Sequence, residues 1–212
     1  MSNIQLQKLI NMGNNQSYKN RALASLEGKW TNGIIATVIY LLITGCVGHA
    51  GSIMFDGITG YGVSGFWWLL CMPLEWGFTV YFLNLIRNED IAYERVFDGY
   101  KDFIRVGLAE FLICVCVIIG CFLLIIPGII LSLMFSQTEY IMKDDPQISA
   151  ADAMKKSAEM MNGHKMELFW LLLSFIGWAI LCVFTFGFGF IFLLPYMSSA
   201  LSHFYEDLKV NA

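Results

Sequence analysis

Hydrophobic residues gather into six long runs along the chain, separated by short polar segments. The runs cover residues 33–50, 66–86, 107–126, 128–142, 168–186 and 190–205. A helix of about 20 apolar residues is long enough to cross a bilayer, and a shorter one crosses where the bilayer thins locally. The pattern therefore predicts an all-α, polytopic membrane protein with six transmembrane helices arranged as three hairpins.

The polar segments before these pairs of runs carry apolar residues at helical spacing, over residues 17–26, 87–105 and 143–165. This spacing is typical of amphipathic helices that lie on a membrane surface. Asn88 is expected to cap the start of the second, and Ser149 with Asp152 forms a capping box for the third. Glycine-rich residues 51–65 predict an outer loop, and the turn of the second hairpin is expected at residues 126–128.

Basic residues predict how the chain is threaded. All thirteen Lys and Arg fall in the segments before, between and after the hairpins, and none falls in the three outer turns. Positive residues accumulate in cytoplasmic loops, so both termini are expected in the cytoplasm. The chain has 57% hydrophobic and 14% charged residues, whereas soluble domains have about 25% charged residues. We therefore predict one transmembrane domain over residues 17–212, preceded by an arm, residues 1–16.

Glu75 is an acidic residue near the centre of the second run, two residues after Pro73. An unpaired acid in hydrocarbon costs about 2.5–3.5 kcal/mol, so it needs a partner or a function. One interpretation is a protonatable group for a proton relay or a cation site. The other is a neutral acid that donates to a backbone carbonyl freed by Pro73, which interrupts the helical ladder. No other charged residue is expected at the depth of Glu75.

Glu110 and Glu139 lie about three residues inside the predicted cytoplasmic ends of the third and fourth runs. There they are expected near each other, reaching water or pairing with Arg105 or Lys143. His49 is expected at the outer interface, too far from Glu75 for contact. These positions favour structural roles over a catalytic one.

His164 and Lys165 join the third amphipathic segment to the fifth run. Gly163 before them is a helix stop, and basic residues here are suited to interfacial anchoring or to contact with anionic lipids at the cytoplasmic face. A contact with a cytoplasmic partner is the alternative. The lipid bilayer and a partner membrane protein are therefore the expected partners. The net charge of −4 argues against nucleic acid.

Several motifs occur in order along the chain: Pro73-Leu74-Glu75-x-Gly77, Ile126-Pro127-Gly128-Ile129, Asp145-Pro146, Gly163-His164-Lys165, Ser174-Phe175-Ile176-Gly177-Trp178 and Pro195-Tyr196. Over about residues 18–208 this series resembles a bacterial integral membrane family, domain of unknown function 975 (DUF975). The resemblance implies a multi-pass protein of the bacterial cytoplasmic membrane and supplies no activity.

Enzymatic and cofactor motifs are missing from the sequence, including His-Glu-x-x-His, the phosphate-binding Gly-x-x-x-x-Gly-Lys and Gly-x-Ser-x-Gly. We therefore expect no enzyme, no cofactor, no metal and no catalytic residue. The leading hypothesis is a non-enzymatic scaffold or accessory membrane subunit. The alternative is a small carrier or channel for a cationic or amphiphilic solute that uses Glu75.

Overall fold

The computed structural model describes residues 15–47 and 58–211, and these residues are mostly helical with no strand among them. The elements are α2 (Asn15–Leu26), α3 (Trp30–Leu41) continued by the π-helical η1 (Leu42–Val47), α5 (Ile58–Arg87), the 3₁₀ helix η2 (Tyr93–Tyr100), α6 (Phe103–Leu123), α7 (Ile125–Phe135), α8 (Thr138–Asp144), α9 (Ala150–Met160), α10 (Lys165–Phe184) and α11 (Phe190–Asn211). The predicted all-α class is confirmed for this part of the chain. His49 and nearly all of the predicted arm lie outside the described residues.

Within the described residues, four helical stretches are long and apolar enough to span a membrane: Leu69–Arg87, Phe103–Phe122, Ile125–Asp144 and Lys165–Phe184. The apolar helix Trp30–Gly45 is shorter, and the C-terminal half of α11 carries too many polar residues to qualify. Four candidate spans suggest a membrane protein. Six crossings in three hairpins are not confirmed.

α5 is the central helix of the fold. Its span is 72% buried within the protein, against 17% for the span in α6 and 22% for that in α10. Side chains on opposite faces of α5, such as Val80 and Phe82, contribute to two separate hydrophobic clusters. The exposed apolar faces of α6 and α10 are the surfaces suited to lipid.

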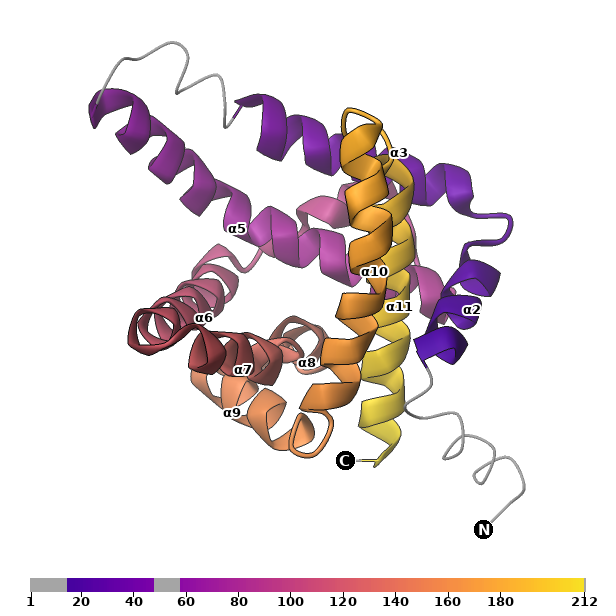
Figure 1. Cartoon of the computed structure of the whole chain (residues 1–212). Coiled ribbons are helices and arrows are strands. Elements are labelled where there is room, and N and C mark those ends of the chain that lie inside the picture. Colours follow the sequence, from indigo (N-terminus) through magenta and orange to yellow (C-terminus); the bar gives the residue numbers. More distant parts are fainter. Residues whose placement is uncertain (1–14, 48–57, 212) are drawn as a thin grey trace.

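The two helical hairpins do not run parallel. Figure 1 shows α10 and α11 upright and side by side, with α2 against α11, whereas α6 and α7 are seen nearly end-on and α5 runs obliquely. Counting residues from the end of one span therefore does not predict which residues of another span lie at the same depth in the membrane. This arrangement controls which polar side chains meet.

Three local predictions were wrong. Residues 58–65, which were expected in a loop, form the start of α5. Glycine weakens a helix without preventing it, so the helix includes the glycines of this segment. Asn88 ends α5 with φ of 56° instead of capping a following helix, because asparagine tolerates the left-handed region. The second hairpin turns at the extended Leu124, and Pro127 occupies the first turn of α7, where its missing N–H costs no hydrogen bond.

The predicted start and end of the helix in the third polar segment are confirmed. The Ser149 hydroxyl accepts from the backbone N–H of Asp152 at 3.1 Å, which caps α9. Gly163 follows α9 with φ of 87°, a conformation that favours glycine. One face of α9 is buried within the protein, at Ala150, Ala153, Met154, Ser157 and Met161.

Candidate functional site

Three acidic side chains from different helices interact with one another. The carboxyl group of Glu139 in α8 interacts with that of Glu110 in α6 and with the Thr79 side chain in α5. Glu75, one turn before Thr79, lies within electrostatic range of Glu139. The Trp76 indole N–H also donates to the Glu139 backbone oxygen at 3.1 Å, which holds α8 against α5.

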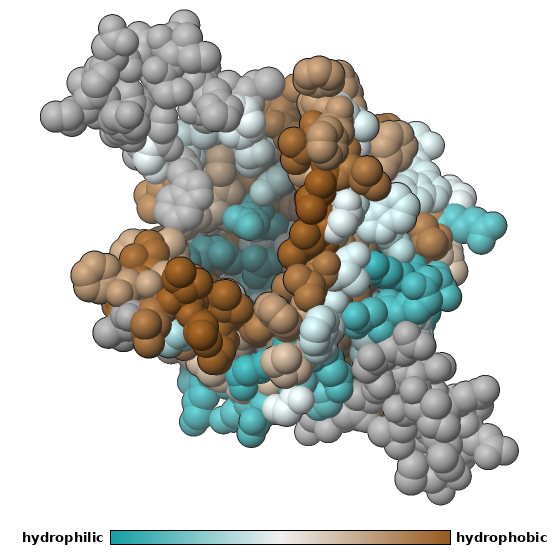
Figure 2. Space-filling model, in the orientation of Figure 1, coloured by the Kyte–Doolittle hydropathy of each residue, from teal (hydrophilic) through white to brown (hydrophobic). Residues whose placement is uncertain are grey.

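The three glutamates remain accessible from the surface. Glu75 is exposed, and Glu110 and Glu139 are partly exposed. Figure 2 shows a hollow between the α6–α7 hairpin and α10, with hydrophilic residues at its floor and apolar residues on its rims. In Figure 1 the same region is bordered by α5, α6 and α8, the helices that carry the three acids.

This cluster corrects one expectation about Glu75. Charged residues do lie near it, because α6 and α8 bring Glu110 and Glu139 to α5. The carbonyl that Pro73 frees is that of Leu69, four residues earlier, and the neighbouring Leu70 oxygen accepts from the Tyr100 hydroxyl at 2.8 Å. The interpretation of Glu75 as a neutral acid that donates to the carbonyl freed by Pro73 stays a prediction.

The expected proximity of Glu110 and Glu139 is found, but their expected basic partners are not. Arg105 pairs instead with Asp102 and donates to the backbone oxygens of Asp145 and Ile148. Among the described residues, none of the three glutamates forms an ion pair with Lys, Arg or His. The cluster thus has acidic groups without a cation to balance them.

An aromatic pair lies beside the acids. The rings of Tyr40 and Phe78 stack with their centroids 4.4 Å apart, and Tyr40 is within electrostatic range of Glu75. No group of three or more His, Cys, Asp or Glu in the described part is placed to hold a metal ion. Aromatic faces and carboxylates together are suited to organic cations.

His164 and Lys165 lie at the start of α10 and do not join the glutamates. The His164 Nδ1 is 3.3 Å from a carboxylate oxygen of Glu167, one turn into the helix, and the His164 backbone oxygen accepts from Glu167 and Leu168. Lys165 is half-buried as the first residue of α10. Their position fits a helix start, and lipid contact remains a prediction.

Sequence reasoning missed an ion-pair network that joins helix ends. Arg87 at the end of α5 binds Asp144 at 2.6 Å and Glu206, and Lys209 also binds Asp144, at 2.7 Å. The Tyr205 hydroxyl donates to Asp144 at 2.8 Å. The signal was the recurrence of opposite charges at the ends of apolar runs, but sequence does not say which ends meet.

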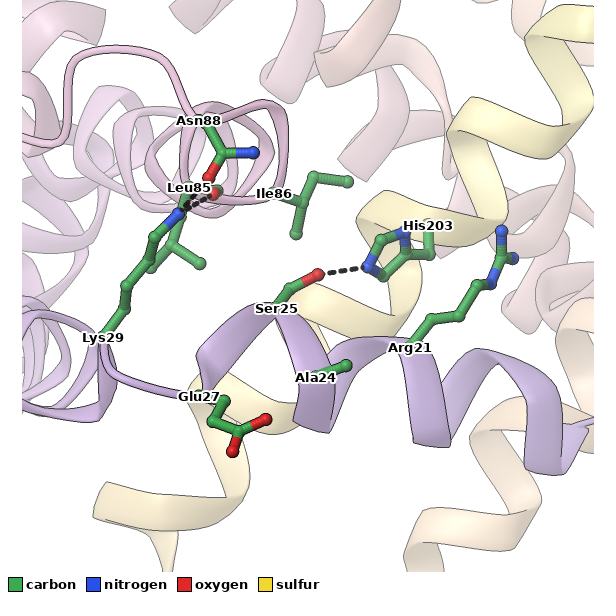
Figure 3. A pocket seen from close by; sticks show the side chains of 9 residues that line it. All are labelled: Arg21, Ala24, Ser25, Glu27, Lys29, Leu85, Ile86, Asn88 and His203. Carbon is green, nitrogen blue, oxygen red and sulfur yellow. Dashed lines mark hydrogen bonds between the residues drawn. The ribbon is translucent and has the colours of Figure 1, made fainter.

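A cavity of about 380 Å³ lies between α2, the end of α5 and α11 (Figure 3). Its lining carries both signs of charge, from Arg21, Lys29 and Glu27. The Ser25 hydroxyl and His203 Nε2 are 2.8 Å apart, and Lys29 donates to the Leu85 oxygen at 3.1 Å. Figure 3 shows both bonds crossing between helices, which makes this cavity a junction of the fold.

His203 makes this junction sensitive to pH. It lies outside the four candidate spans, and burial, with the nearby Arg21 charge, lowers its pKa to about 4, while Asp207 opposes the shift. The unfolded chain, with a histidine pKa of about 6.5, then binds a proton that the folded chain does not. Stability is full above pH 6.5 and falls as pH drops from 6.5 towards 4.

We expect the melting temperature of the purified protein to fall over this pH window, and the fall to be smaller in His203→Gln. Thermal unfolding in detergent from pH 7.5 to 4.5 measures the difference. Equal slopes for the two proteins would show that His203 does not contribute.

A known protein family matches the C-terminal part of the chain. Residues 109–212 match the family described as Protein of unknown function (DUF975). The resemblance is confirmed over these residues. No curated protein and no solved structure matches the chain.

The DUF975 match contains Glu110 and Glu139 but not Glu75. It covers α7 to α11 and most of α6. Two acids of the cluster therefore belong to the matched part, and the third comes from the central helix that precedes it.

Proposed function

We propose that this protein binds an organic cation in the hollow beside Glu75, Glu110 and Glu139 and carries it across the bacterial cytoplasmic membrane. The observation that carries the proposal is the meeting of three accessible carboxyl groups from three apolar helices, with no basic partner among the described residues. A bound cation would offset the cost of acids in an apolar setting.

The chemistry suits exchange of a proton for a cation. Two carboxyl groups that lie close together in an apolar setting favour a proton on one of them, as for Glu110 and Glu139. A cation that enters next to Glu139 would replace this proton, and the Tyr40 and Phe78 rings would contact its apolar part. The proposal requires no covalent step, in keeping with the expectation of a non-enzymatic protein.

The proposed topology places both termini in the cytoplasm. The ends assigned to that side by the positive-inside rule do meet: Arg87, Asp144 and Lys209 form one network. Such a network is suited to the aqueous side of the membrane, where partly exposed ion pairs remain solvated.

Transport of the fluorescent cation ethidium into proteoliposomes tests the proposal. We expect uptake by the wild-type protein and a loss of about tenfold or more in Glu75→Gln and in Glu139→Gln, because a charge-assisted contact is worth roughly 1.5–3 kcal/mol. Glu89→Gln, which changes an exposed acid beyond the end of α5, is the matched control. Uptake that is the same in all four proteins would refute the carrier.

A scaffold is the second candidate. Its support is a row of exposed aromatic residues on and after η2, where Phe97, Tyr100 and Phe103 are 41%, 39% and 37% exposed. Such residues suit a membrane interface or a partner surface. Copurification of a partner that is lost in Phe97→Ser, together with no ethidium uptake by any variant, would favour the scaffold over the carrier.

A further inference from the structure

The cavity of Figure 3 lies where α2 meets the end of α5 and the C-terminal half of α11. Its volume of about 380 Å³ is within the range of small-molecule sites. Leu85 and Ile86 line it at the end of the candidate span Leu69–Arg87, and its polar lining residues lie outside the four candidate spans. The end of a span lies next to the headgroup region, so water and lipid headgroups both reach this cavity.

Lys29 brings a positive charge without a bound carboxylate to the lining. Its Nζ donates to the Leu85 backbone oxygen at 3.1 Å and to Asn88 Oδ1, which are neutral acceptors and use two of its three donors. Among the described residues, Lys29 forms no ion pair. Arg21 also lines the cavity, but Asp207 balances its charge through two hydrogen bonds, at 2.9 and 2.6 Å. An anion would therefore be attracted to the Lys29 side of the cavity.

Neutral polar groups line the same space. Because Asn88 Oδ1 accepts from Lys29, the amide nitrogen of Asn88 is directed away from Lys29, towards the side of the cavity that His203 lines (Figure 3). The Ser25 hydroxyl lies on that side, 2.8 Å from His203 Nε2. Ammonium, amide and hydroxyl groups are the side-chain groups that proteins use to bind phosphate oxygens.

Glu27 is the acid among the described lining residues, and it does not balance Lys29. It forms no ion pair with Lys29 or Arg21. In Figure 3 its carboxylate points away from both side chains, and the residue is exposed to solvent. Because water and salt screen an exposed charge, Glu27 weakens an anion site here only a little.

We propose that this cavity binds a phosphate group of net negative charge, with its oxygens next to the Lys29 ammonium and the Asn88 amide. The headgroup of an anionic phospholipid and a small soluble phosphate share this chemistry, and the experiment distinguishes them. The site contains none of the three glutamates, so it does not depend on the proposed transport.

Native mass spectrometry of the full-length protein in mild detergent tests the lipid source, with phosphatidylglycerol and phosphatidylcholine of identical chains as probes. The choline group cancels the phosphate charge, so we expect the wild type to retain phosphatidylglycerol about fivefold better. Lys29→Met is expected to lose this preference. Lys155→Met, which removes an exposed lysine of α9, is the matched control and keeps it.

Thermal unfolding of the same proteins tests the soluble source, with inorganic phosphate as the probe and chloride at equal ionic strength as the reference. A ligand that binds only the folded state raises the melting temperature. We expect phosphate to raise it in the wild type and in Lys155→Met but not in Lys29→Met, if the source is a soluble phosphate.

Asn88→Asp separates binding from folding, because Lys29→Met also removes two hydrogen bonds to the end of α5. Aspartate keeps an oxygen that accepts from Lys29, and it tolerates the left-handed conformation found at Asn88, with φ of 56°. Its carboxylate would balance Lys29 and repel a phosphate. We therefore expect this variant to unfold at the wild-type temperature or above and to lose phosphate binding.

Either effect in the wild type, lost in both Lys29→Met and Asn88→Asp, supports the site and identifies its source. Phosphatidylglycerol preference alone assigns the lipid headgroup, and stabilisation by inorganic phosphate assigns a soluble phosphate. Neither effect in the wild type, or an effect that persists in Lys29→Met or in Asn88→Asp, would overturn the proposal.

Discussion

Replacing Gly99 with alanine is expected to lower the free energy of unfolding by about 3 kcal/mol, the upper part of the range for overpacking. A Cβ atom at Gly99 would lie 2.0 Å from the Pro73 backbone oxygen, and one at Gly77 would lie 1.9 Å from the Val96 oxygen. These two contacts press η2 against α5 on both sides of Glu75. Because the obstructing atoms are backbone, side-chain rotation cannot relieve the clash.

Gly107→Ala is the matched control for Gly99→Ala. Gly107 lies inside α6, and a Cβ atom there meets nothing within 4 Å. Alanine is favoured over glycine in a helix by about 1 kcal/mol, so no loss of stability is expected. Thermal unfolding in detergent compares the three proteins, and equal melting temperatures would show that η2 and α5 are not in close contact.

Arg87→Met is expected to cost about 2–4 kcal/mol, because it removes one partner from a half-buried ion-pair network. The Arg87 and Asp144 side chains are each 18% exposed, and the change leaves Glu206 without its arginine. Asp144 keeps Lys209 and Tyr205, which places the loss below that of a fully buried pair.

The control for Arg87 is Arg95→Met. Arg95 pairs with Asp90, and the two side chains are 38% and 56% exposed. Exposed pairs contribute little to stability because water screens them, so this variant is expected to remain close to the wild type. Denaturant unfolding separates the two variants, and a loss in Arg95→Met as large as that in Arg87→Met would contradict the structural role given to the network.

Local signals in the sequence predicted local structure well. The Ser149 capping box and the Gly163 stop depend on neighbouring residues, and both are found. The turn at Leu124 was missed because a proline followed by glycine usually marks a turn, whereas Pro127 is equally suited to a first helical turn. Residues 58–65 were missed because glycine weakens a helix without forbidding it.

The acidic cluster was predicted only in part, for a geometric reason. Counting residues from predicted helix ends placed Glu110 beside Glu139, which is correct, and placed Glu75 deeper and alone. That count assumes parallel spans. Because α5 runs obliquely and α6 and α7 cross α10 at a different orientation, residues at unequal counts come together (Figure 1).

The affinity of the purified protein for ethidium tests the central claim most directly, because it reports on the shared carboxyl site without requiring transport. In fluorescence titrations, we expect the wild type to bind ethidium. The affinity is expected to be about tenfold weaker in each of Glu75→Gln, Glu110→Gln and Glu139→Gln, since each variant loses a charged contact. Glu89→Gln should bind as the wild type does. Equal affinity in all five proteins would contradict the claim that the three glutamates form one cation site.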